Sequence, residues 1–284
     1  MKRIVGVNFD EVGKIYWFNP GPLTITKGVK VVVETVRGLE LAEAVTEIKE
    51  VEDSEILYEL KDVVRVADSK DIKQFEENIV KANESCSKVK EIIKDYKLDM
   101  KLLGCEYTLD GTKLLIYYNA EGRVDFRELV KALASEFKVR IELRQIGPRE
   151  GAKKIGAMGT CGRELCCKKH IREFDLVTMK MAKEQGMALS SSKIAGVCGK
   201  LMCCIAYENA AYEDAKKRVP SVGDMVKTPN CDKCKVISAD YLRERVKTDN
   251  DGAIEEWEAK QVTRLKGSKP KEEKNNSEDL DLED

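Results

Sequence analysis

The chain has a single histidine, few aromatic residues and almost no net charge. His170 is the only histidine among 284 residues, which excludes a metal site built from several histidines and an active site that needs two imidazoles. Aromatic residues make up 6% of the chain, which is little for a protein that stacks nucleic-acid bases on its side chains. Lys and Arg (50) nearly cancel Asp and Glu (51). The whole chain therefore lacks the basic excess typical of proteins that bind nucleic acid through its phosphates.

Long apolar runs and nucleotide-binding motifs are missing as well. No stretch approaches the roughly 18 to 20 apolar residues that a membrane helix needs, and the first ten residues, MKRIVGVNFD, are too short in apolar length for a signal peptide. We therefore predict a cytoplasmic protein, in which thiols stay reduced and clustered cysteines indicate metal or redox chemistry more often than disulfides. The sequence has no P-loop, no G-x-G-x-x-G after a predicted strand and no Ser/His/Asp set, so no motif in it predicts an enzyme.

What the sequence does contain is ten cysteines, six of them in two copies of one phrase. The pattern C-G-[RK]-x-[LM]-C-C begins at Cys161 and again, 37 positions later, at Cys198. Matched thiols on two segments can close around one metal centre or hold two. The candidate metal-ligating and cofactor-binding residues are therefore Cys161, Cys166, Cys167, Cys198, Cys203 and Cys204.

The spacing of these cysteines does not choose the metal. Thiolate is a soft ligand that selects zinc, copper(I) or iron–sulfur clusters. The C-x₄-C step occurs in plant-type iron–sulfur proteins, and structural zinc sites commonly use C-x₂₋₄-C pairs. Consecutive side chains point in different directions in regular structure. We therefore expect the two thiols of each Cys-Cys doublet to bind at two neighbouring metal sites and not to the same metal atom. Buried free cysteines or thiol redox chemistry are the alternatives that need no metal.

The remaining candidates are weaker. Cys231 and Cys234 form a C-x-x-C, which is either an extra metal site or an incidental pair. Cys86 lies on a predicted helix and Cys105 in a predicted strand, and we interpret both as packing residues. His170 follows two lysines, so we interpret it as a partly exposed histidine in a basic loop.

The pattern of apolar residues predicts an α+β fold made of several small units. We expect an N-terminal β unit, a ferredoxin-like βαββαβ unit, a cysteine-rich metal-binding segment, a C-terminal small β-barrel and a disordered charged tail. Their predicted boundaries are 1–60, 61–147, 148–218, 219–266 and 267–284.

The ferredoxin-like unit depends on four predicted elements after its first strand. They are a long helix over 69–95, a hairpin around Asp110-Gly111, a helix over 125–137 with Asp125 as its N-cap, and a strand over 139–146. The residues expected on the inner side of the long helix are Ile72, Phe75, Ile79, Val80 and Ala82.

Several segments together resemble one known family. They are residues 118–130, 140–147 and 180–185, together with both cysteine phrases. These segments resemble the bacterial YaaT/RicT family, whose members share the conserved C-terminal region of yeast polymerase-suppressor proteins. The likeness runs from about residue 1 to residue 265.

The resemblance implies a non-enzymatic regulatory subunit. Members of this family associate with small helical proteins of the YlbF/YmcA type, and the complex is linked to ribonuclease Y-dependent mRNA processing and to sporulation, competence and biofilm development. The resemblance also implies that the six cysteines of the two phrases are ligands of 4Fe–4S clusters, some of them shared with partner subunits. Relatives usually have a Gly-rich hairpin where this chain has Cys231 and Cys234, so no role is implied there.

Two other functions compete with this interpretation. One is a zinc-stapled RNA-binding module, because residues 147–204 carry 11 basic against 5 acidic side chains. Its predicted sheet offers mainly Tyr107, Tyr117 and Tyr118 instead of the aromatic pair that RNA-reading sheets use. The other is a redox enzyme that cycles the cysteine doublets, although a vicinal disulfide is strained and no thioredoxin-like βαβ context surrounds them. The sequence leaves direct contact with nucleic acid and the number of clusters open.

Overall fold

The computed structural model describes residues 2–10, 12–52, 59–122 and 124–265. It combines helices with three separate sheets, so the α+β class is confirmed. The contacts divide the chain into two compact units, which are described separately. Unit 1 comprises Met1–Leu176 and Ile194–Cys203, and unit 2 comprises Val177–Lys193 and Cys204–Asp284. The predicted tail lies outside the described residues.

The first sheet of unit 1 has six antiparallel strands around a valine-rich core. Its order is β2 (Tyr16–Phe18), β1 (Lys2–Asn8), β4 (Leu39–Ala44), β3 (Lys30–Glu34) and β6 (Val63–Val66), while β5 (Lys49–Val51) also pairs with β1. The side chains of Val5, Val7, Val31 and Val33 are completely buried. They alternate along their strands, as expected for a sheet with one face on a core.

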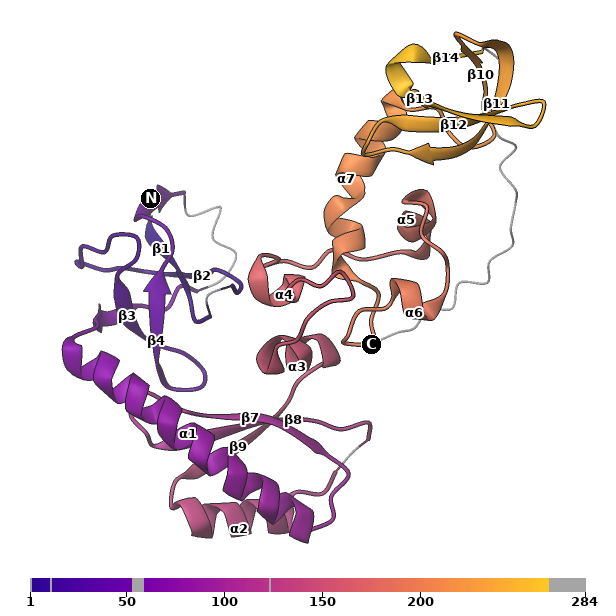
Figure 1. The fold of residues 1–284 in the computed structure, drawn as a ribbon. Helices are drawn as coiled ribbons and strands as arrows, with labels where there is room; N and C mark the ends of the chain where they lie inside the picture. Colours follow the sequence, from indigo (N-terminus) through magenta and orange to yellow (C-terminus); the bar gives the residue numbers. More distant parts are fainter. Residues whose placement is uncertain (1, 11, 53–58, 123, 266–284) are drawn as a thin grey trace. The chain divides into compact units, whose positions relative to one another are not determined.

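The second sheet of unit 1 has three strands, in the order β7 (Lys101–Tyr107), β8 (Lys113–Asn119) and β9 (Arg140–Gln145). The predicted Asp110-Gly111 hairpin is confirmed, since Gly111 takes a positive φ of 68° between the antiparallel β7 and β8. The parallel step from β8 to β9 runs through α2 (Arg127–Phe137). Helices α1 (Ser69–Asp95) and α2 share one core with this sheet (Figure 1).

The strand order corrects the ferredoxin-like prediction. That arrangement needs β6 in the same sheet as β7, β8 and β9, but β6 pairs with β3 in the first sheet. Val63 and Val66 lie opposite Val33 and Val31, and Val63 is buried in the first core. The pairing of valines of β6 with valines of β3 therefore places β6 in the N-terminal sheet.

The long helix begins and ends where the sequence predicted, but its inner face differs. Phe75, Ile79 and Val80 are 36%, 48% and 60% exposed, so the prediction that they point inward was wrong. Ala82 is buried as predicted, but the buried positions before it, Asp71 and Asn78, are polar. Asn78 is buried and donates hydrogen bonds to the carbonyl oxygens of Thr108 and Leu109, at 3.0 and 3.1 Å. The pattern of apolar residues could not predict this face, because its buried contact is made by the side-chain amide of Asn78 with two carbonyl oxygens and not by a hydrophobic side chain.

The predicted cap of α2 was also wrong. The helix begins at Arg127 with Phe126 at the N-cap position, and Asp125 lies one residue further out. The guanidinium of Arg127 binds the Asp125 carboxylate at 2.6 Å. The inward face is as predicted in its centre, because Leu129 and Leu133 are buried against the second sheet.

Helix α3 (Pro148–Ile155) carries the chain from the second sheet into the cysteine-rich segment. A Cβ placed on Gly151 would lie 3.0 Å from Leu103 of β7, so the helix packs closely on the sheet. The Nζ atom of Lys153 binds Asp10 at 2.9 Å, and Lys154 pairs with Glu106. Both sheets of unit 1 therefore help to position the segment that follows.

Unit 2 contains a five-stranded antiparallel sheet after a long helix. The strand order is β13 (Ala253–Glu258), β12 (Arg245–Asn250), β11 (Cys231–Asp240), β10 (Met225–Thr228) and β14 (Thr263–Arg264). A short 3₁₀ turn, η2 (Ala259–Gln261), returns the chain so that β14 pairs with β10 (Figure 1). The core of the sheet consists of Val219, Val226, Val236, Val246 and Ala259.

Helix α7 (Cys203–Arg218) leads into this sheet, and α5 (Met179–Glu184) packs beside it. Gln185, at the end of α5, donates a hydrogen bond to the carbonyl oxygen of Ile205 at 2.6 Å. Arg218, at the end of α7, pairs with Glu244 at 2.9 Å. Across the described ranges, no helix is both long enough and apolar enough to cross a bilayer.

The capping box at the start of α1 generates the first prediction. Asp68 accepts a hydrogen bond from the Asp71 N–H, and Asp71 accepts one from the Asp68 N–H at 3.0 Å. The Arg65 guanidinium holds the pKa of Asp71 at about 2, and the hydrogen bond from Asp68 adds to this effect. We expect Asp71→Asn to lower the free energy of unfolding at pH 7 by about 1 kcal/mol.

The effect has a defined pH dependence. A carboxylate with a lowered pKa stabilises the fold above its ordinary pKa of about 4, and this contribution is lost as pH falls toward 2. Urea unfolding followed by circular dichroism should therefore show a difference between wild type and Asp71→Asn that shrinks from pH 5 to pH 2. Glu76→Gln, an exposed change on the same helix, is the control. A difference that does not depend on pH would contradict the assignment.

Candidate metal centre

The two cysteine phrases fold as two copies of the same hairpin. In the first copy, an antiparallel bridge joins Met158 and Glu164, and helix α4 (Cys166–Lys169) begins at the cysteine doublet. In the second copy, the bridge joins Ala195 and Leu201, and α7 begins at the doublet. A short helix precedes each hairpin, namely α3 in the first copy and α6 (Ser191–Ile194) in the second. The sequence repeat is therefore also a structural repeat.

The backbone hydrogen bonds of the two hairpins match one for one. The N–H of Gly159 donates to the carbonyl oxygen of Arg163 at 2.7 Å, and the N–H of Gly196 donates to that of Lys200 at 2.9 Å. Two further pairs of bonds repeat with the same offset. They run from Gly162 to Gly159 and from Gly199 to Gly196, and from Leu165 to Ala157 and from Met202 to Ile194.

Glycine is required at the tip of each hairpin. Gly162 and Gly199 have φ angles of 74° and 81°, in the left-handed region that other residues enter at a cost. Gly159 and Gly196 lie beside the thiols instead. A Cβ on either residue would lie 3.4 Å from the sulfur of Cys161 or 3.6 Å from that of Cys198. The tip glycines therefore shape the turns, whereas a side chain at Gly159 or Gly196 would make ordinary van der Waals contact with the first thiol of its copy.

Within unit 1 the two hairpins meet through their cysteines. The thiols of Cys166 and Cys203, which begin their respective helices, are hydrogen-bonded to each other, and Cys161 lies close enough to Cys166 to interact with it electrostatically. Cys167 interacts in the same way with Cys198. Five of the six predicted residues are thus brought together, and Cys204, the next residue of α7, is counted with unit 2.

Burial and mutual repulsion make these thiols reluctant to ionise. Burial is the largest cause that raises the pKa of Cys166, Cys167 and Cys203, and the neighbouring cysteines raise it further. Cys167 is 6% exposed, whereas Cys161 is open to solvent. The site therefore has a buried side at the first doublet and an accessible side at Cys161.

One residue near the site was missed by sequence reasoning. The guanidinium of Arg149 favours the charged form of Cys167 and of Cys203, and it lies over the ring of Phe174 at 4.7 Å. Pro148 as the first residue of a helix is a recognisable start signal, and it would have placed Arg149 on α3.

The donor set fits a thiolate-bound centre, but the thiols are not arranged around a metal. Five clustered sulfurs offer the soft ligands that zinc and iron–sulfur clusters prefer. Among the described residues, no group of three or more His, Cys, Asp or Glu side chains has the geometry of a metal site. The identity of the ligands and of the metal therefore stays a prediction.

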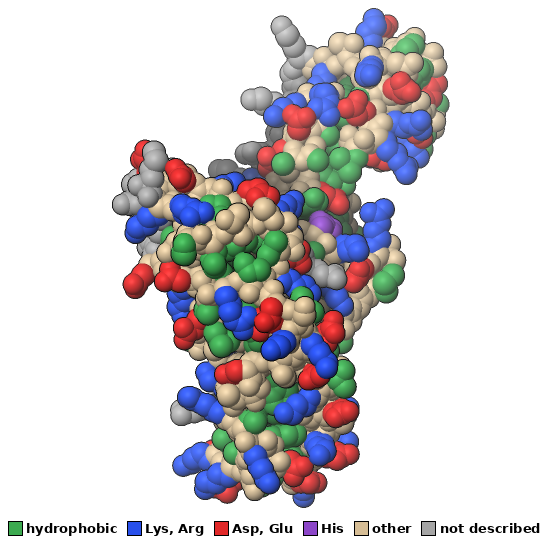
Figure 2. All heavy atoms as spheres, turned by 90° about the vertical axis from the view of Figure 1, so that its left-hand side faces the viewer, with side chains coloured by type: hydrophobic (Ala, Val, Ile, Leu, Met, Phe, Trp, Pro, Cys, Tyr) green, Lys and Arg blue, Asp and Glu red, His purple; other side chains and the backbone are tan. Residues whose placement is uncertain are grey.

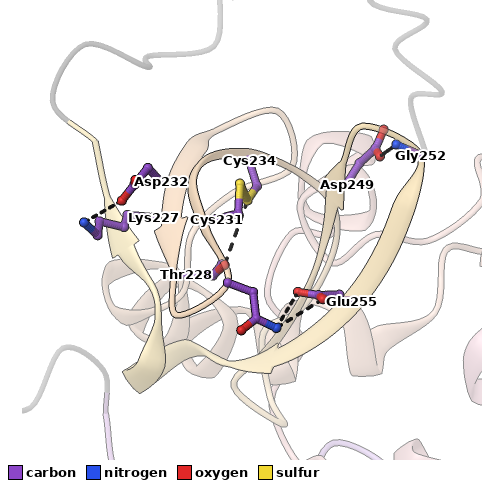
Figure 3. Close-up of a disulfide and its surroundings, with 9 residues drawn as sticks. Lys227, Thr228, Cys231, Asp232, Cys234, Asp249, Gly252 and Glu255 are labelled. Carbon is purple, nitrogen blue, oxygen red and sulfur yellow. Dashed lines mark hydrogen bonds and ion pairs between the residues drawn. A yellow bond between two sulfur atoms is a disulfide. The ribbon is translucent and has the colours of Figure 1, made fainter.

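The weaker candidates are not among the five clustered thiols. His170 is exposed at the end of α4. Cys86 and Cys105 are hydrogen-bonded to each other and pack in the core of the second sheet. The sulfurs of Cys231 and Cys234 are bonded to each other (Figure 3), so neither is a free metal ligand in this structure.

Comparison with known proteins assigns the family. The PSP1 C-terminal conserved region matches residues 61–146, and the third domain of PSP1-like proteins matches residues 176–219. Stage 0 sporulation protein YaaT of Bacillus subtilis (strain 168) is 46% identical over 230 residues, which are 81% of this chain and 84% of that protein. This chain belongs to the YaaT family. The resemblance found in the sequence is thereby confirmed.

Shorter matches connect the YaaT family to yeast proteins. Protein PSP1 of Saccharomyces cerevisiae is 47% identical over 47 residues, which are 16% of this chain and 6% of that protein. An uncharacterized protein of Schizosaccharomyces pombe, PB7E8.02, is 47% identical over 49 residues, 17% of this chain and 6% of that protein. No solved structure matches the chain.

The left-handed glycines lead to a second prediction. We expect Gly162→Ala and Gly199→Ala each to destabilise its hairpin by about 1 kcal/mol, which is about fivefold in the opening equilibrium. Hydrogen exchange read by mass spectrometry should be faster in peptides covering 157–165 or 194–202. Gly122→Ala is the control, because Gly122 has an unrestricted φ and open space around it. Unchanged exchange in both variants would show that the tips do not need glycine.

Proposed function

We propose that this chain is a non-enzymatic, cytoplasmic regulatory subunit whose paired hairpins hold an iron–sulfur centre. The observation that carries the proposal is the meeting of two structurally matched hairpins through Cys161, Cys166, Cys167, Cys198 and Cys203. The relative in Bacillus subtilis is named for stage 0 of sporulation, so we extend a regulatory role in sporulation to this chain. The family resemblance adds competence and biofilm development to the proposal.

The chain's own residues would hold the centre in a defined way. A bound 4Fe–4S cluster would supply bonds that join the two hairpins. The candidate ligands would be the cysteines of both copies, with Cys204 as the sixth, and Arg149 would offset the negative charge that thiolates and sulfides accumulate. A cluster held by one copy alone would have three cysteine ligands, one fewer than the four that such a cluster takes. A partner subunit would therefore complete a cluster at the exposed Cys161.

The partners we propose are small helical proteins of the YlbF/YmcA type. Their complex with this chain would modulate mRNA processing by ribonuclease Y. In this proposal the two sheets of unit 1 form a scaffold that presents the cysteine hairpins. The C-terminal β-barrel stays a prediction, because β14 pairs with β10 at one edge of that sheet and β13 forms the other edge.

The zinc-stapled RNA-binding alternative has less support. The three tyrosines that would have to stack bases are engaged within the fold. The hydroxyl of Tyr107 is hydrogen-bonded to Ser85 at 3.0 Å, and Tyr117 and Tyr118 are each 7% exposed. Figure 2 also shows basic and acidic side chains interspersed over the face in view.

The third prediction concerns the metal itself. Purified without oxygen, the chain alone or with a helical partner should show a broad shoulder near 400 nm, with matching amounts of iron and sulfide. We expect Cys161→Ser and Cys198→Ser to lose most of the bound iron. Cys86→Ser, which lies outside the site, is the control. A colourless protein with stoichiometric zinc would overturn the iron–sulfur proposal and make RNA binding the next test.

The fourth prediction concerns assembly. The same two variants should fail to form the complex with the helical partner while keeping the far-ultraviolet circular dichroism of the wild type. Co-elution in size-exclusion chromatography without oxygen measures this directly. A complex that forms equally well with both variants would show that the cysteine site does not serve as the docking element.

A further inference from the structure

The C-x-x-C of the C-terminal sheet has no part in the proposed cysteine site. We propose that Cys231 and Cys234 form a reversible redox site that exchanges with small thiols and disulfides, with Cys231 as the sulfur that is attacked. The proposal does not depend on the function proposed above.

A bulge brings the two sulfurs together. Residues three apart in a regular strand point to opposite faces of the sheet. Here Val226 of β10 pairs with Cys234, and Thr228 of β10 pairs with Cys231. Between these two pairs β10 advances by two residues and β11 by three, so β11 contains one extra residue. The extra residue turns both cysteines to the same side, where their Cα atoms are 6.0 Å apart and their sulfurs are joined (Figure 3).

The two sulfurs differ in access. Cys234 is 2% exposed, whereas Cys231, the first residue of β11, is only half-buried. The buried hydroxyl of Thr228 lies 3.9 Å from the sulfur of Cys234 (Figure 3). An incoming thiolate therefore reaches Cys231, and Cys234 is the leaving sulfur, with a hydroxyl beside it.

The exchange balances with a monothiol such as glutathione as the reductant. Its thiolate attacks Cys231, a new S–S bond forms, the Cys231–Cys234 bond breaks, and Cys234 leaves as a thiolate that takes a proton from solvent. A second glutathione thiolate attacks the glutathione sulfur of the mixed disulfide and releases Cys231. The net reaction converts two glutathiones and one protein disulfide into oxidised glutathione and two protein thiols. The reverse reaction oxidises the pair.

The position of the Cys231–Cys234 disulfide favours reversible thiol–disulfide exchange over a role in stabilising the fold. The two cysteines are separated by three positions, and so short a loop constrains the unfolded chain least. The strand that carries them is already paired with β10 on one side and β12 on the other. Asn230 ties the adjacent turn to Glu255 of β13 at 3.2 Å. We therefore expect reduction to leave the sheet folded.

The test follows the two cysteines on separate peptides of the full-length chain. The protein is equilibrated without oxygen in glutathione buffers of graded ratio, alkylated, and digested on the N-terminal side of aspartate. Cleavage before Asp232 leaves Cys231 in peptide 224–231 and Cys234 in peptide 232–239, away from the repeated cysteines. We expect the two peptides to pass from linked to separately alkylated in one reversible transition.

Two single variants identify the attacked sulfur. In oxidised glutathione, Cys234→Ser should accumulate the mixed disulfide at Cys231, with about tenfold more adduct than Cys231→Ser accumulates at Cys234. The double variant, compared with wild type by circular dichroism, should keep the fold. The proposal is overturned if the peptides stay linked at every ratio until denaturant is added, if they are never linked, or if both single variants form the adduct equally. Because these peptides exclude the repeated cysteines, failure here leaves the iron–sulfur proposal untouched.

Discussion

The crowding of half-buried thiols is the constraint on which the functional part of this molecule depends. Five sulfurs from two hairpins lie within interacting distance, and each thiolate that forms raises the pKa of its neighbours. Clustered thiols of this kind either stay protonated or bind a cation that offsets the charge of several thiolates. Arg149 is a positive charge that acts on Cys167 and Cys203, but one guanidinium cannot neutralise five thiolates. The site is therefore suited to accept further positive charge, which a metal centre would supply.

The rest of unit 1 holds this group in place. Lys153 and Lys154, successive residues of α3, pair with Asp10 next to the first sheet and with Glu106 in the second. Lys154 also lies over the ring of Tyr117 at 4.0 Å. Further along, Arg172 donates a hydrogen bond to the carbonyl oxygen of Gly13 at 3.2 Å. The segment that carries the first hairpin is thus tied to both sheets before its cysteines, and to the loop between β1 and β2 after them.

Local signals in the sequence predicted where helices and turns occur better than they predicted which strands pair and which helix faces are buried. The bounds of α1 and the Asp110-Gly111 hairpin follow from capping and turn chemistry, which involve only neighbouring residues. The position of β6 does not, because it depends on pairing with Val31 and Val33, some thirty residues earlier. The exposed Phe75 and Ile79 show the same limit, since the buried face of α1 was decided by a distant pair of carbonyls bound to Asn78.

The candidate site was predictable to the same extent. A repeat of six cysteines is visible in the sequence, and it identified every thiol that the hairpins bring together. Arg149 was not identified, because its distance from the cysteines along the chain hid its proximity in space. The disulfide between Cys231 and Cys234 could not be predicted either. Regular alternation places these two side chains on opposite faces, and only the bulge in β11 reverses this.

The two copies of the hairpin are equivalent in backbone but not in surroundings. Both have a left-handed glycine after the first cysteine and a helix that starts at the doublet, yet α4 has 4 residues and α7 has 16. The phrase C-G-[RK]-x-[LM]-C-C therefore determines the turn and the helix start, while the sequence that follows determines how far the helix runs. In the first copy Cys167 is buried and Cys161 is exposed. A centre held by these thiols would be closed at the first doublet and open at Cys161, and the open side is where a partner subunit could add a ligand.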